Sequence, residues 1–178
     1  LQVALPSTAH DVKGLLLDSV FGENPSIIIE HRSLFSMSDD VPEIPYRVKF
    51  GQALVRKEGE DLTIVALGVM VPIALQAAEV LRSAGTSAEV VDLRTISPMD
   101  TETILQSVAK TGRLAVLDAD WQSFGIASEV ITVVCEKMME NLKARPVRVC
   151  LPDSHTPMSS ALETAYYPSV DQVVAELK

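Results

Sequence analysis

The chain has 178 residues, of which 47% are hydrophobic, which is enough to bury the core of one domain and leave a remainder. Its formal charge of −9 excludes nucleic acid as a partner, because counterion release requires clustered Lys and Arg. No apolar run approaches the roughly 20 residues of a membrane span, and no secretory leader pattern opens the chain, so a cytoplasmic protein is predicted. Cys135 and Cys150 show no metal-ligand spacing and are expected to be reduced thiols.

The first 30 residues are predicted to form a strand, a helix and a second strand. The strands cover residues 3–5 and 26–30, and Ser7 or Thr8 caps a helix that runs to about Val20. Two strands and one helix cannot close a core. Residues 1–30 are therefore expected to be the tail of a larger, truncated domain, particularly since the chain begins without Met inside an apparent strand.

Periodicity disappears over residues 31–45, where Ser, Asp and Pro accumulate, and this stretch is predicted to be a linker. Residues 46–178 then alternate short strands with helices. Strands are predicted over 47–56, 62–67, 87–93, 113–118 and 146–151. Helices begin near Pro72 and Asp100, a longer helix runs from Gly125 to about Leu142, and the last helix begins at Ser169, where Ser169 and Gln172 fit a capping box. Such alternation requires crossover connections, so the fold class is α/β, with a small doubly wound, mostly parallel sheet.

Ligands of such sheets bind beyond the carboxyl ends of the strands. The turn at Gly68 lacks both glycine-rich phosphate patterns, which favours an ordinary strand-to-helix turn. Arg94 follows Asp92 at a strand end, where it pairs with a neighbouring carboxylate, contacts a ligand or reaches across a subunit interface. Asp118 and Asp120 could contact a hard cation, but two carboxylates alone do not define a metal site.

Trp121 and His155 are the remaining candidates. Trp121, the only Trp, is either a lid over the core or an interface anchor. His10, His31 and His155 lack the spacing of a zinc site or a catalytic motif, but His155 lies in a Pro-rich loop suited to contacts. Arg94, Trp121 and His155 are therefore the predicted interface or site-proximal residues, and no catalytic, cofactor-binding or metal-binding residue is predicted.

A family resemblance covers essentially the whole chain. It is carried by Leu5-Pro6-Ser7-Thr8, Asp11-Val12-Lys13-Gly14, Ile29-Glu30-His31, Asp92-Leu93-Arg94-Thr95-Ile96-Ser97-Pro98-Met99-Asp100 and Ala165-Tyr166-Tyr167-Pro168. The first three segments resemble the end of the pyrimidine-binding domain in beta subunits of the pyruvate, branched-chain 2-oxoacid and acetoin dehydrogenases. The last two resemble the transketolase-type carboxy-terminal domain of those subunits, here assigned to residues 46–178.

The resemblance implies part of an oxidoreductase that decarboxylates a 2-oxoacid with thiamine diphosphate and Mg and passes the acyl unit to lipoyl groups. Its expected partners are an alpha subunit and a second beta subunit, usually in a two-plus-two tetramer, and a dihydrolipoyl acyltransferase core. The family's activating Glu, active-site His and diphosphate motif would lie outside these residues. The chain alone is therefore expected to be inactive and free of cofactor, to serve subunit assembly, and to have homodimerisation as one option.

Two alternatives stay open. The chain could be the carboxy-terminal domain of a transketolase or a deoxyxylulose-phosphate synthase, although the Asp-Leu-Arg-Thr-x-Ser-Pro-x-Asp run favours the dehydrogenases. It could also be a stand-alone ligand-binding or assembly module, because common folds host many functions. The segment Gln122-Ser123-Phe124-Gly125-Ile126 and His155 depart from the family's expected pattern, and neither identifies a substrate.

Overall fold

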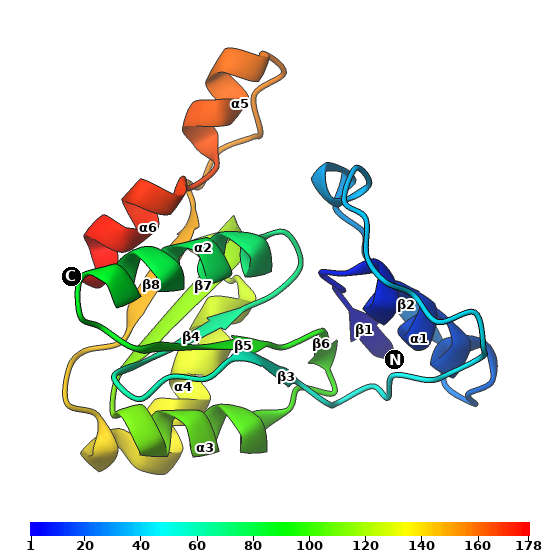
Figure 1. The fold of residues 1–178 in the computed structure, drawn as a ribbon, viewed down its shortest axis with the longest axis horizontal. Helices are drawn as coiled ribbons and strands as arrows, with labels where there is room; N and C mark the ends of the chain where they lie inside the picture. Colours follow the sequence, from blue (N-terminus) through cyan, green and yellow to red (C-terminus); the bar gives the residue numbers. More distant parts are fainter.

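Two sheets organise residues 1–178, all of which the computed structural model describes (Figure 1). The smaller sheet has the strand order β2-β1-β6 and the larger has the order β3-β5-β4-β7-β8. The strands are β1 Gln2–Ala4, β2 Ser26–Ile28, β3 Leu54–Lys57, β4 Leu62–Ala66, β5 Ala88–Asp92, β6 Thr95–Ser97, β7 Leu114–Trp121 and β8 Val147–Leu151. The helices are α1 Ala9–Val20, α2 Met70–Ser83, α3 Thr101–Thr111, α4 Ile126–Met138, α5 Ser160–Tyr166 and α6 Val170–Leu177, with 3₁₀ turns at Arg32–Leu34 and Met139–Asn141.

The larger sheet is mostly parallel and covered on both faces, as predicted. β5, β4, β7 and β8 run parallel, and β3 joins as an antiparallel edge strand. Alternate residues of β4 enter opposite cores: Ile64 and Ala66 pack with α2 and α6, whereas Val65 packs with α3 and α4. Full burial of Ile64 or Val65 contributes about 1.5–3 kcal/mol each. These two cores confirm the α/β, doubly wound fold class.

The first 30 residues form the predicted strand-helix-strand unit, called the N-terminal unit below. β1 and β2 are parallel, with Val3 opposite Ile27, and α1 connects them. Thr8 caps α1 by accepting a hydrogen bond from the backbone N–H of Asp11 at 3.2 Å. Residues 51–178 are called the C-terminal unit, and in Figure 1 the two lie side by side with α5 standing away from both.

One strand crosses between the units and was not predicted. β6 belongs to the C-terminal part of the sequence but pairs antiparallel with β1, where Val3 lies opposite Ser97. The backbone N–H of Leu5 continues the contact by donating to the carbonyl of Arg94 at 2.8 Å. The segment 95–97 is therefore a strand rather than part of a loop, because β1 offers it an unpaired edge.

Helix boundaries follow their local signals. Asp100 caps α3 by accepting from the N–H of Thr103 at 3.1 Å, and Gly112 ends the helix at φ 70°. Ser169 and Gln172 form the predicted capping box of α6. No helix combines the length and the apolar content that a bilayer crossing needs.

Three expectations about element boundaries were wrong. The strand predicted over 47–56 covers only Leu54–Lys57, because the N–H of Gly51 donates to the Thr95 hydroxyl and that of Ala53 to the Asp100 carboxylate. β7 continues past Asp118 to Trp121, which pairs with Leu151. The helix predicted from Gly125 to Leu142 is α-helical only to Met138. α5 was missed because a helix of seven residues shows too few turns to reveal periodicity.

Candidate functional site

A buried ionic cluster joins the two units. Asp11 of α1 and Asp92 at the end of β5 are both inaccessible to solvent, and Arg56 of β3 lies between them. Its guanidinium donates to the Asp92 carboxylate at 2.9 and 3.0 Å and also contacts Asp11. The Ser7 hydroxyl donates to Asp92 at 2.6 Å. This cluster fixes the start of α1 against the edge of the larger sheet.

Burial governs the electrostatics of the cluster. It raises the pKa of Asp92 above the ordinary value, against the opposing effects of the Ser7 hydrogen bond and the Arg56 charge. Burial likewise lowers the pKa of Arg94, against the attraction of Asp11. One Asp11 oxygen, Oδ1, has no hydrogen-bond partner and lies 3.5 Å from His10 Nδ1.

Arg94 lies beside this ionic cluster. Its Nε is 3.4 Å from Asp11 Oδ2, its side chain is only 11% exposed, and its backbone N–H donates to Asp92. Its φ of 57° is unusual for a residue with a Cβ. These contacts match pairing with a neighbouring carboxylate, one of the three alternatives predicted for Arg94. A role at a subunit interface stays a prediction.

Trp121 and His155 lie together, away from Arg94. The Trp121 indole N–H donates to the carbonyl of Ser154 at 3.0 Å, and the Trp121 and His155 rings meet edge to face with centroids 6.4 Å apart. Trp121 is 42% exposed and His155 is exposed as well, so the pair forms a surface feature over β7 and β8. An anchoring role for this pair remains a prediction.

A cleft of about 460 Å³ opens between the units, at the carboxyl ends of β4 and β7. It is lined by residues that follow β2, by the turn at Gly68, and by Asp118, Asp120 and Glu129. Burial raises the pKa of Asp118, although its carboxylate accepts a hydrogen bond from the N–H of Ala127 at 3.1 Å. The location matches the carboxyl-edge rule for parallel sheets.

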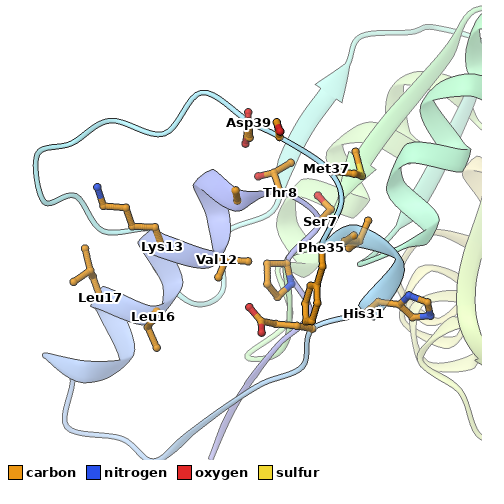
Figure 2. A pocket seen from close by; sticks show the side chains of 15 residues that line it. Ser7, Thr8, Val12, Lys13, Leu16, Leu17, His31, Phe35, Met37 and Asp39 are labelled. Carbon is orange, nitrogen blue, oxygen red and sulfur yellow. The ribbon is translucent and has the colours of Figure 1, made fainter.

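A second hollow of about 590 Å³ lies on the N-terminal unit (Figure 2). The α1 side chains Val12 and Leu16 form one wall, and Phe35 and Met37, from the segment after the 3₁₀ turn, form the other. Leu16, Phe35 and Met37 are more than half exposed, so this hollow is an open apolar groove. An open apolar groove of this size is typical of a contact surface.

Thiamine diphosphate, which the family resemblance implies, does not fit these residues. A diphosphate is held by basic side chains, free amides or a bridging metal ion. The inter-unit cleft gathers carboxylates instead, among them Asp118 and Asp120. No group of three or more His, Cys, Asp or Glu side chains is placed to hold a metal ion, and Arg56 and Arg94 face buried carboxylates.

Sequence reasoning missed Asp11 and Arg56, the central residues of the ionic cluster. Asp11 had a local explanation in the first turn of a helix, and Arg56 looked like a polar residue of an edge strand. The sequence offered one indication of this cluster. Three of its polar residues, Ser7, Asp11 and Asp92, lie in separate segments that carry the family resemblance.

Comparisons with known proteins agree with the fold. The family described as "Transketolase, C-terminal domain" matches residues 51–173. The chain is 42% identical over 175 residues to the acetoin:2,6-dichlorophenolindophenol oxidoreductase subunit beta of Cupriavidus necator, covering 98% of this chain and 52% of that protein. It is 41% identical over 175 residues to the pyruvate dehydrogenase E1 component subunit beta of Bacillus subtilis, covering 98% of this chain and 54% of that protein.

A solved structure described as a split gene transketolase, inactive beta4 tetramer, matches 99% of this chain and 56% of its own, with a TM-score of 0.81 and 31% identity. The chain thus spans about half the length of the curated relatives it matches. The predicted resemblance to dehydrogenase beta subunits and to a transketolase-type domain is confirmed. The chain belongs to the transketolase C-terminal domain family and corresponds to the carboxy-terminal part of beta subunits of 2-oxoacid dehydrogenases.

Proposed function

We propose that the intact protein is the beta subunit of a thiamine-diphosphate-dependent component that decarboxylates a 2-oxoacid, and that this chain serves its assembly. The observation that carries the proposal is the similarity to two beta subunits over 98% of the chain, which includes both units. A shared fold alone would not support a function, but 41–42% identity to proteins of this kind does.

The surface of the N-terminal unit supports an assembly role. Leu16 and Val20 on α1 and Phe21 directly after it are each more than half exposed, and Phe35 and Ile44 in the following segment are about 70% exposed. A soluble monomer rarely leaves so many large apolar side chains on one small unit, so these residues mark a surface that another chain or segment covers. The expected partners are an alpha subunit and a second beta subunit.

The cofactor belongs to the assembly and not to this chain alone. When bound, thiamine diphosphate would supply the electron sink that decarboxylation of a 2-oxoacid requires, and its diphosphate needs cationic or metal contacts that these residues do not offer. The contribution of this chain is to keep its two units, and the surfaces they present to neighbouring chains, in a fixed arrangement through the ionic cluster of Asp11, Arg56 and Asp92.

Calorimetry and enzyme assays test the proposal. Titration of thiamine diphosphate with MgCl₂ into this chain should give no micromolar binding, whereas the intact beta subunit with its alpha subunit should bind the cofactor and release CO₂ from pyruvate or a branched 2-oxoacid. Micromolar binding by this chain alone contradicts the assembly role.

The likeness to a split gene transketolase favours one other candidate, a transketolase-type enzyme. The same assays separate the two. Turnover of sugar phosphates by the intact protein, with none of 2-oxoacids, supports the transketolase type and rejects the dehydrogenase.

A further inference from the structure

The inter-unit cleft has a partly apolar lining supplied by both units. At about 460 Å³ it falls in the range of ordinary ligand pockets. Its apolar lining includes Leu5 of the N-terminal unit, Leu67 and Val69 after β4, and Ile126 at the start of α4. A hydrocarbon group placed against these side chains would be partly removed from water.

The charge around the cleft has one sign. Glu30, Asp118, Asp120 and Glu129 line it, and no Lys or Arg does. None of these four carboxylates takes part in an ion pair of the structure. His31 is the only other titratable lining group. Walls of low dielectric focus the field of such carboxylates, so the cleft attracts cations and repels phosphates.

An aromatic side chain at the rim is held out in solvent. Phe124 is fully exposed and has a φ of 66°, an unfavourable backbone conformation for a bulky residue. It lines the cleft beside Gly125, the N-cap of α4. An aromatic face in this position can cover a guanidinium or an ammonium group through cation–π attraction.

We propose that this cleft binds an Arg or Lys side chain carried on an apolar segment of another polypeptide. The carboxylates complement the cation, the apolar lining contacts the flanking aliphatic side chains, and the exposed Phe124 ring covers the cation. A neutral apolar segment would remove the exposed carboxylates of Asp120 and Glu129 from water without compensation. A metal ion is disfavoured because no three ligands converge. The proposal does not depend on the catalytic identity of the intact protein.

Titrations with capped tripeptides on the ¹⁵N-labelled chain test the proposal. Acetyl-Leu-Arg-Leu-amide should shift the amide resonances of Gly68 and Gly125, which line the cleft, and leave Gly85 and Gly112 unmoved. Because the probe is small, a dissociation constant of about 1 mM is expected. The neutral isostere, with citrulline in place of Arg, should bind at least about five-fold more weakly than the Arg peptide. Raising the salt concentration should weaken binding of the Arg peptide.

A matched pair of variants locates the charge effect. Glu129→Gln should weaken binding of the Arg peptide by about two- to five-fold, as expected for an exposed ion pair. Glu136→Gln, on the same helix two turns away and outside the cleft, should not change it. Each of three outcomes overturns the proposal: no shift of Gly68 or Gly125, equal binding of the Arg and citrulline peptides, or MgCl₂ alone shifting the same amides at a lower concentration than the peptide.

Discussion

Removing the Arg56 guanidinium should destabilise the chain strongly, and more at neutral than at acid pH. In Arg56→Met, the two buried carboxylates of Asp11 and Asp92 lose their shared cation. Loss of one partner from a buried ion pair costs about 3–5 kcal/mol, and Arg56 is 18% exposed, so little of this is screened by solvent. The free energy of unfolding, from urea denaturation at pH 7, should fall by about that amount.

The pH dependence follows from Asp92. Burial raises the pKa of Asp92 above its unfolded value, so the unfolded chain releases this proton first as the pH rises. Ionisation of Asp92 therefore opposes folding, and its cost appears as the pH rises from the unfolded pKa through the folded pKa. Without Arg56 the folded pKa of Asp92 rises further, and the variant should recover part of its stability near pH 4.

The control for Arg56→Met is a substitution of an exposed Arg. Arg82→Met removes an exposed guanidinium that pairs with Glu79 on α2, and it should lower the free energy of unfolding far less than Arg56→Met does. The ionic cluster does not hold the units together if Arg56→Met lowers the free energy of unfolding no more than Arg82→Met does. The same conclusion follows if Arg56→Met lowers this free energy equally at pH 4 and pH 7.

Three further predictions concern single side chains. Trp121→Ala should weaken association with the partner subunits more than it weakens folding, and unchanged sedimentation with an alpha subunit would refute this. Asp100→Ala should cost about 1 kcal/mol of unfolding free energy at pH 7, because Thr103 loses its cap. Although burial acts to raise the Asp100 pKa, hydrogen bonds from Thr103 lower it overall, so the wild-type advantage should disappear as the pH falls below about 4. Burial raises the pKa of the Cys150 thiol to about 11, so its alkylation by iodoacetamide should keep accelerating above pH 9 in the folded chain, whereas a plateau near pH 9 would contradict this.

The elements that sequence reasoning found are those with local causes. Asp100 and Gly112 bound α3 through contacts within a few residues, and Ser169 caps α6 in the same way. β6 could not be found in this way, because its three residues are extended only by pairing with β1, more than 90 positions earlier. A short strand without alternation carries no signal of its own.

The ionic cluster escaped prediction for a related reason. Arg56 lies 36 residues from Asp92 and 45 from Asp11, and each of the three residues has an ordinary local explanation. Trp121 and His155 were singled out separately by residue type and loop position, and the structure shows them in contact. The strained backbone of Phe124 follows from a turn that no composition rule describes.

The contacts that join the two units determine how the chain can take part in an assembly. The β1–β6 ladder and the hydrogen bond from the Gly68 N–H to the Leu5 carbonyl at 3.1 Å join the units by backbone, while Arg56 joins them by charge. Breaking these contacts would expose unpaired backbone groups and two buried carboxylates together, which makes hinge motion between the units unfavourable. The apolar groove beside α1 and the acidic cleft are therefore held at a fixed spacing, so partners that engage both surfaces need no rearrangement of this chain.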